Sequence, residues 1–179
     1  MSRPMVYFAR AVDGLPRDEV LRLGEEVADE LGRHGLAMAD PVAVWTDTSG
    51  PVTDYIALVE SDLAVLRKCD GVLVDMTIPR RSYVGCVGEL MYAHLWRKPA
   101  VVWVGDTGLE DRPWLRYHAS AVVRTRDEAV SAIIRLLASG APDRELEDEE
   151  HDRHQKAESE FPRRECSGAE QDDSRRDQR

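Results

Sequence analysis

Cysteine is scarce in this 179-residue sequence, which contains only Cys69, Cys86 and Cys166. Their separation excludes a CxxC metal or redox motif, and an odd number of widely spaced cysteines does not suit a disulfide framework. We therefore expect reduced thiols in a cytoplasmic protein. The histidines also lack any spacing, to one another or to cysteine, that would predict a metal site, so we expect neither a metal nor a redox cofactor.

Long apolar runs and an excess of basic residues are also missing. No stretch reaches the roughly 18 apolar residues of a transmembrane helix, and the N-terminus has no apolar signal segment, so no membrane contact is expected. The net charge is −10, whereas proteins that bind DNA or RNA carry a basic face, so no nucleic-acid partner is expected. The sequence has neither a G-x-G-x-x-G nor a Walker motif.

Short apolar runs alternate with amphipathic segments through the first 140 residues. Strands are predicted at 5–9, 36–39, 71–75, 100–104 and 121–124, and helices at 16–34, 54–68, 84–97 and 126–139. This alternation predicts a single α/β domain, residues 1–140, in which a mostly parallel five-stranded sheet has helices on both faces. Ligands of such sheets bind outside the carboxyl ends of the strands.

Two segments lack this periodic pattern. Residues 141–179 contain 14 acidic and 8 basic residues and no apolar periodicity, so they are predicted to form a disordered charged tail. Residues 40–53 are rich in Pro, Gly, Ser, Thr and Asp. An irregular stretch of that length inside a compact domain predicts a loop beside the functional site.

The loop and helix start at 79–89 contain the most informative chemistry. Gly85 and Gly88 let a ligand approach the backbone closely near a helix N-terminus, where amide groups can bind a sugar or a phosphate. Glu89 follows among apolar residues, which raise the energy of a carboxylate, whereas the helix dipole lowers it. Glu89 is therefore either a functional carboxylate or a structural glutamate that complements the dipole.

Other side chains could complete such a site. Asp62, on the predicted helix 54–68, could orient or protonate a leaving base, or be a solvated helix charge. Tyr7 could place its hydroxyl in the crevice at the sheet edge, or be a core aromatic with one polar contact. Arg80 and Arg81 lie in the loop that precedes the predicted helix 84–97. They could bind a phosphate group of the ligand, or be exposed there without a partner.

Taken together, three segments resemble the nucleoside 2-deoxyribosyltransferase family, which includes related nucleoside 5′-monophosphate N-glycosidases. The first holds Val6-Tyr7-Phe8 with Asp13-Gly14. The second holds Asp62-Leu63 with Cys69-Asp70-Gly71-Val72-Leu73-Val74-Asp75. The third holds Gly85-x-x-x-Glu89-Leu90-x-x-Ala93, followed by Arg97-Lys98-Pro99. The resemblance spans roughly residues 5–137, in order and with spacing near that of the family.

The resemblance implies a flavodoxin-like fold and a nucleoside or nucleoside 5′-monophosphate as the small-molecule substrate. It makes Glu89 the nucleophile at the anomeric carbon, has Asp62 hold or protonate the base, and has Tyr7 position Glu89. Two-step displacement would then pass the (deoxy)ribosyl group to water or to another base. The resemblance also implies a homodimer or higher homo-oligomer with shared active sites, to which Ser120, in the segment 118–120, would contribute.

The chain departs from the family pattern where the 5′ end of the sugar is recognised. Tyr83, with Ser82 adjacent, stands where the transferases have a carboxylate and the nucleotide hydrolases a serine. Ala11 and Asp13 stand where the nucleotide hydrolases use a serine and an arginine. Ser82, Tyr83 and Asp13 are therefore expected beside the substrate in roles that differ from those in the family.

Three functions stay open on these grounds. The first is the glycosidase or transferase activity, with Arg80, Arg81 and Arg10 as alternative cations for a 5′-phosphate. The second is a nucleotide-binding or regulatory module that keeps the glycine-lined pocket but does no chemistry. The third is hydrolysis of the glycosidic bond of NAD, which the same carboxylate chemistry permits.

Overall fold

A parallel sheet of five strands organises residues 3–42 and 54–139, the parts of the chain that the computed structural model describes. The strand order is β2-β1-β3-β4-β5, and every pairing between neighbours is parallel. This order is typical of flavodoxin-like folds. The strands are β1 (Met5–Arg10), β2 (Ala37–Ala39), β3 (Gly71–Asp75), β4 (Ala100–Trp103) and β5 (Ala121–Val123).

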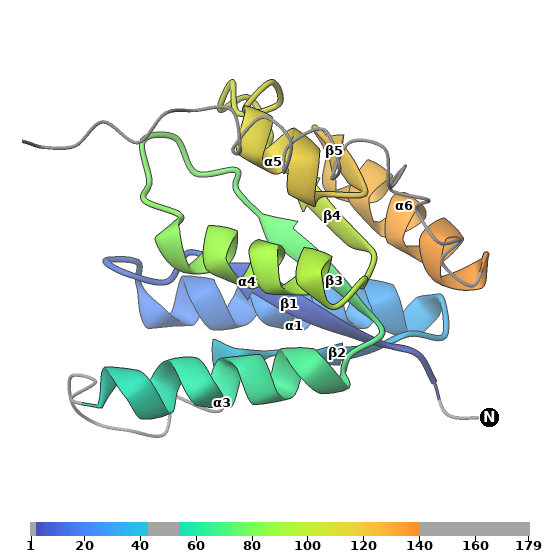
Figure 1. The fold of residues 1–179 in the computed structure, drawn as a ribbon, viewed down its shortest axis with the longest axis horizontal. Coiled ribbons are helices and arrows are strands. Elements are labelled where there is room, and N and C mark those ends of the chain that lie inside the picture. Colours follow the sequence, from blue (N-terminus) through green and yellow to red (C-terminus); the bar gives the residue numbers. More distant parts are fainter. Residues whose placement is uncertain (1–2, 43–53, 140–179) are drawn as a thin grey trace, which may run out of the picture. The chain divides into compact units, whose positions relative to one another are not determined.

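Helices cover both faces of the sheet (Figure 1). The layer on one face contains α1 (Arg17–Arg33) and α6 (Arg126–Ala138), and the layer on the other face contains α3 (Tyr55–Lys68), α4 (Val84–Leu95) and α5 (Pro113–His118). Because both faces are covered, the central strand β3 is buried along its whole length, which explains its uninterrupted apolar sequence.

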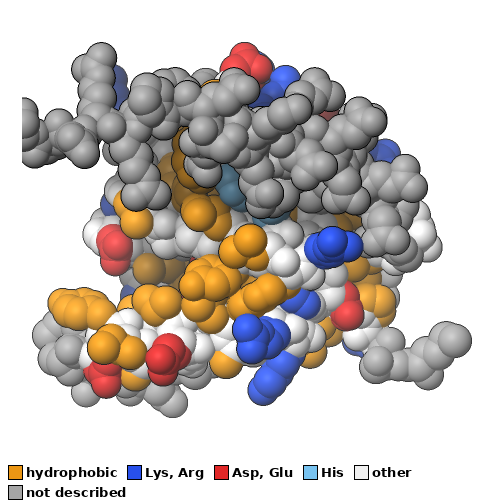
Figure 2. Space-filling model, viewed as in Figure 1, with side chains coloured by type: hydrophobic (Ala, Val, Ile, Leu, Met, Phe, Trp, Pro, Cys, Tyr) orange, Lys and Arg blue, Asp and Glu red, His pale blue; other side chains and the backbone are white. Residues whose placement is uncertain are grey.

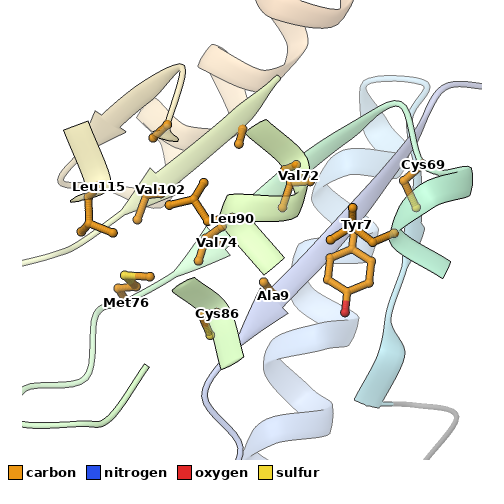
Figure 3. Packing of buried hydrophobic residues seen from close by; sticks show 14 of the residues in the cluster. Tyr7, Ala9, Cys69, Val72, Val74, Met76, Cys86, Leu90, Val102 and Leu115 are labelled. Atoms are coloured by element: carbon orange, nitrogen blue, oxygen red, sulfur yellow. The ribbon is translucent and has the colours of Figure 1, made fainter. Parts of the chain in front are cut away.

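Neighbouring residues of β1 point into different layers, since side chains alternate along a strand. Tyr7 is fully buried with Leu66 of α3 and Leu90 of α4, whereas Phe8 is fully buried with Val27 of α1. Figure 3 shows the first of these clusters, with Tyr7 on β1 and Leu90 on α4. Burying one such apolar side chain stabilises the fold by about 1.5–3 kcal/mol.

Local signals in the sequence begin and end the helices. Thr125 and Glu128 form a capping box at the start of α6, in which each side chain accepts a hydrogen bond from the backbone N–H of the other residue. Asp54 caps α3 by accepting a hydrogen bond from the Ala57 N–H at 2.9 Å. After α1, Gly35 adopts φ 77°, a left-handed conformation that glycine takes without steric cost.

A buried ion pair joins the end of β1 to the end of β2. Arg10 donates to both carboxylate oxygens of Asp40, at 2.9 and 2.8 Å. Gly24 of α1 lies directly against this pair, because a Cβ atom there would stand 2.6 Å from Asp40 Oδ2 and 2.9 Å from Arg10 Nη2. A side chain at position 24 would therefore displace the ends of both ion-paired side chains.

The predicted α/β architecture is confirmed, and the sheet is parallel throughout the described residues. The predicted strands and helices differ from the observed ones mainly at their ends. The helix predicted at 84–97 ends at Leu95, and Arg97 adopts a left-handed backbone with φ 54°, which does not continue a right-handed helix. The short helix α5 was not predicted.

Some predictions concern residues outside the described part of the chain. The expected disordered tail at 141–179 lies there, as do residues 43–53 of the expected loop and the predicted domain boundary at 140. Among the described helices, none has the length and apolar character needed to cross a membrane. The described residues also contain no cluster of three or more His, Cys, Asp or Glu side chains able to hold a metal ion.

Candidate active site

A short hydrogen bond joins the first strand to the fourth helix. The hydroxyl of Tyr7, a fully buried residue of β1, donates to Oε1 of Glu89 on α4 at 2.5 Å. Within the described residues, Oε2 of Glu89 accepts no hydrogen bond. The arrangement fixes the glutamate through one of its two carboxylate oxygens.

The position of Glu89 on α4 explains its unusual ionisation. Cys86, Leu90 and Ala93 form the buried side of this helix against the sheet, and Glu89 lies partly buried beside them. Burial raises the pKa of Glu89 to about 7. The Tyr7 hydrogen bond opposes this by lowering the pKa, whereas the charge of Asp62 raises it further. The carboxyl group therefore holds its proton to a higher pH than an exposed glutamate does.

The hydroxyl of Tyr7 stays protonated under the same conditions. Burial raises its pKa far above the ordinary value for tyrosine, and the charges of Glu89 and Asp62 raise it further. Tyr7 is therefore a hydrogen-bond donor to Glu89 across the physiological pH range. It does not compete with Glu89 as a base.

Asp62 lies close enough to this pair to affect both ionisations. It is a partly buried residue of α3, and its charge raises the pKa of Glu89 and of Tyr7. Three residues predicted from separate segments of the sequence therefore share one electrostatic environment. Their catalytic roles stay predictions.

Open space lies in front of the two glycines of α4. A Cβ atom built on Gly85 or on Gly88 would meet no atom of residues 3–42 or 54–139 within 4 Å, its own surroundings in the helix aside. Glycine inside a helix costs about 1 kcal/mol relative to alanine, and packing within the described residues does not require either glycine. The space fits the predicted close approach of a ligand to this helix.

Tyr83 is engaged within its own loop, residues 76–83. Its hydroxyl accepts a hydrogen bond from the Ile78 N–H at 2.8 Å and donates to the Ile78 carbonyl at 3.0 Å. The ring packs against the core layer beneath α4. Ser82, its neighbour, is exposed. Tyr83 was expected to face the substrate. Its hydroxyl instead closes the loop before α4 by these two hydrogen bonds.

Arg81 connects this loop to the loop after β1. Its Nη1 donates to the carbonyl oxygen of Asp13 at 2.5 Å, so the structure brings together two residues that were predicted to bind substrate. Arg80 is exposed and adopts φ 58°, an uncommon conformation outside glycine. Arg10, considered as a third cation for a phosphate, instead lies buried in its pair with Asp40.

Ser120 lies at a different place from the residues above. Its Oγ accepts a hydrogen bond from the Ala100 N–H at 3.1 Å, and its own N–H donates to the Ala100 carbonyl at 2.7 Å. Within one chain, Ser120 thus lies beside the start of β4, two strands away from β1. The structure does not bring it to Glu89 of the same chain.

Sequence reasoning gave no site role to Asp75 at the carboxyl end of β3. Asp75, the last residue of β3, is 4% exposed and accepts a hydrogen bond from the Thr77 N–H at 2.9 Å. Burial raises the pKa of Asp75, while the Thr77 hydrogen bonds and the Arg10 charge lower it. The available signal was a carboxylate at the end of an apolar strand.

In comparisons with known proteins, only the search of solved structures gives matches, and these support the fold. No family model and no curated protein matches the chain. A conserved protein from Enterococcus faecalis V583 is similar in structure, with TM-score 0.56 and 14% identity over 74% of this chain and 98% of that chain. A 2-deoxyribosyltransferase from the psychrotolerant bacterium Bacillus psychrosaccharolyticus is similar with TM-score 0.53 and 15% identity, over 69% of this chain and 88% of that chain.

Proposed function

We propose that the chain cleaves the N-glycosidic bond of a nucleoside or nucleoside 5′-monophosphate through Glu89, and passes the (deoxy)ribosyl group to water or another base. The observation that carries this proposal is the hydrogen bond from Tyr7 to Glu89 at 2.5 Å, with Asp62 in the same electrostatic environment. The structural similarity to an enzyme described as a 2-deoxyribosyltransferase supports it at the level of the fold.

The proposed reaction proceeds in two displacements. The Glu89 carboxylate attacks the anomeric carbon C1′ through its free oxygen, while the C1′–N bond breaks and the base leaves with the bonding electrons. Asp62 holds the base or supplies its proton. Water or another base then attacks C1′ of the glycosyl-enzyme, which restores Glu89 and retains the configuration. Tyr7 donates to the other oxygen of Glu89 and so fixes its orientation.

Replacement of Glu89 tests the proposal directly. Glu89→Ala removes the nucleophile, and we expect the rate of base release to fall by roughly two orders of magnitude or more. The assay is chromatography of a nucleoside and nucleotide panel, each with and without a second free base. Glu60→Ala, at an exposed glutamate on α3, is the matched control and should retain activity. Unchanged base release by folded Glu89→Ala protein would refute the proposal.

A nucleotide-binding module without chemistry is the second candidate. It is favoured by the internal hydrogen bonds of Tyr83 and Arg81, which engage two side chains expected to contact the substrate. In that case a nucleotide would raise the melting temperature of the protein and remain intact after long incubation. The same chromatographic panel therefore distinguishes binding from cleavage.

We also propose that the chain forms a homodimer or higher homo-oligomer. Apolar side chains gather on the surface over α3 and α4 (Figure 2). An exposed apolar patch of this kind usually marks a site of contact with another molecule. The exposed large apolar residues of α3, α4 and α5 are Tyr55, Ile56, Val59, Val84, Met91, Tyr92, Leu95, Trp114 and Tyr117.

A further inference from the structure

A cavity of about 270 Å³ lies against α1 at the carboxyl ends of β1 and β3. The chain leaves β1 toward α1 and β2, and leaves β3 toward α4 and β4, so the strand order reverses between these two strands. Ligands of open parallel sheets bind at such a switch point. The cavity therefore lies where a fold of this class is able to hold a small molecule.

Two charged residues form the floor of this cavity. Asp75 and Arg10 are paired across β3 and β1, and both line it. They are 4% and 7% exposed. Thr77 fixes the Asp75 carboxylate by donating its backbone N–H to Oδ1 at 2.9 Å. Because a carboxylate has about four acceptor sites, Asp75 can accept further hydrogen bonds from a ligand in the cavity.

The charges around this floor leave one negative charge in excess. Arg10 donates to both oxygens of Asp40 and so neutralises that carboxylate, which leaves the charge of Asp75 unbalanced. Arg126 lies near enough to lower the pKa of Asp75, but it is itself ion-paired with two glutamates of α1. A buried charge is costly without a partner of opposite sign. A cation in the cavity would supply that partner.

The mouth of the cavity carries charges of both signs. Arg22 of α1 lines it and is exposed, so an anion could meet this guanidinium at the surface. Glu19 and Glu26 line the same cavity, three residues before and four residues after Arg22, and side chains at these spacings are neighbours on a helix. Two carboxylates therefore offset the Arg22 charge at the mouth, and Asp75 repels an anion from the floor.

Apolar side chains line the cavity as well, namely Leu15, Val20, Leu23 and Ile78. We propose that the cavity binds a small organic cation, in which a flat apolar body contacts these walls and an amidinium, guanidinium or ammonium group donates hydrogen bonds to Asp75. Its volume lies just below the range of about 300–1,000 Å³ found for ligand pockets. It therefore suits a ligand of one or two rings.

Side-chain alternation separates this cavity from the Tyr7–Glu89 pair. Tyr7 faces the layer of α3 and α4. Leu73 faces the layer of α1 and α6, and Asp75, two residues further along the same strand, lies on that face too. Binding of the cation thus goes beyond the proposed function and does not depend on it.

Benzamidine is the test probe, since it joins a flat ring to a cationic group that carries N–H donors. Benzamide is its neutral counterpart and benzoate its anionic one. Dissociation constants are measured by titrating the backbone amide signals in NMR spectra of the full chain. A fragment of this size should bind with a Kd of roughly 1 mM. We expect benzamidine to bind at least about tenfold more tightly than the other two, because its hydrogen bonds to Asp75 are charge-assisted, and to shift the amides of Leu23 and Ile78.

Two variants connect this preference to the cavity. Asp75→Asn removes the charge but keeps an acceptor for the Thr77 N–H, so the preference for benzamidine over benzamide should fall to about twofold or less. Asp106→Asn, at an exposed position after β4, is the matched control and should retain the preference. Leu23→Trp fills the cavity from α1 and should weaken benzamidine binding by about tenfold or more.

Several results would overturn the proposed cation site. Equal affinity for benzamidine and benzamide would do so, as would amide shifts confined to residues outside the cavity lining. Tighter binding of benzoate or of inorganic phosphate would indicate an anion site that depends on Arg22 instead. A preference for benzamidine that survives Asp75→Asn would exclude Asp75 as the acceptor. Because this substitution is nearly isosteric, it decides the question even if Leu23→Trp fails to fold.

Discussion

At the scale of single residues, two opposing effects set the pKa of Glu89, namely its burial and its hydrogen bond from Tyr7. Burial raises the pKa of Glu89 to about 7, and the Tyr7 hydroxyl counteracts this by favouring the charged form. A nucleophile must be ionised to attack. The pH dependence of the reaction therefore reports on both residues.

We expect kcat/KM to fall as the pH drops below about 7, because Glu89 becomes protonated. Tyr7→Phe removes the hydrogen bond that lowers the pKa of Glu89, so the acid limb of the profile should shift to higher pH and activity at pH 7 should fall. The measurement is kcat/KM from pH 5 to 9 for both proteins. An acid limb that stays in place, or that moves to lower pH, would contradict the role given to Tyr7.

The sequence suggested the residues of the pair but not its ionisation. Tyr7 and Glu89 are separated by 82 positions, and each could be read as structural from its local context alone. Their hydrogen bond arises because β1 and α4 meet in one layer. That contact belongs to the fold, and a single sequence without the family resemblance gives no direct sign of it.

At the scale of elements, the loop 76–83 and the helix that follows it form one unit. Two hydrogen bonds between the Tyr83 hydroxyl and the backbone of Ile78 close the loop, and Arg81 ties it to the loop after β1. The loop leads directly into α4 and its two glycines. Its conformation therefore helps to set the approach to Glu89.

Tyr83→Phe should loosen this loop without emptying the core beneath it. Both hydrogen bonds to Ile78 are lost, so the Ile78 amide should exchange with solvent faster, and KM should rise about threefold or more while kcat changes less. Tyr117→Phe, on exposed α5, serves as the control. An unchanged Ile78 exchange rate would show that the hydroxyl does not hold the loop.

Periodicity predicted the longer elements and failed for the shortest helix. The helices α1, α3, α4 and α6 have apolar residues at helical spacing over three or more turns, whereas α5 has six residues, too few to establish a period. The hydrogen bonds of Tyr83 were not predictable either. Their partner is the backbone of Ile78, which leaves no trace in the side-chain pattern.

At the scale of the whole molecule, the alternation of strands and helices was sufficient to predict the fold class. The parallel order β2-β1-β3-β4-β5 follows the flavodoxin-like topology that the family resemblance implied. The cavity between β1, β3 and α1 was not predicted. It depends on Arg10 of β1 lying beside Asp75 of β3. Predicting that contact requires the register between the two strands, and the positions of the strands in the sequence are not enough.

Assembly is the property of the whole molecule that is easiest to measure. We expect light scattering to give a dimer or larger species, and Leu95→Glu combined with Tyr117→Glu to shift it toward monomer, because both side chains are more than half exposed on α4 and α5. Val12→Glu, an exposed apolar residue away from these helices, is the control. A monomeric wild-type protein would contradict the proposed assembly.

The contact of Gly24 with the Arg10–Asp40 pair has a consequence for how the sequence can vary. A side chain at position 24 would collide with both members of the pair, and loss of either member would leave a buried charge without its partner. Substitutions at the three positions are therefore expected to be coupled. Among homologous sequences they should co-vary as one triplet, although they are separated along the chain and none of them takes part in the proposed chemistry.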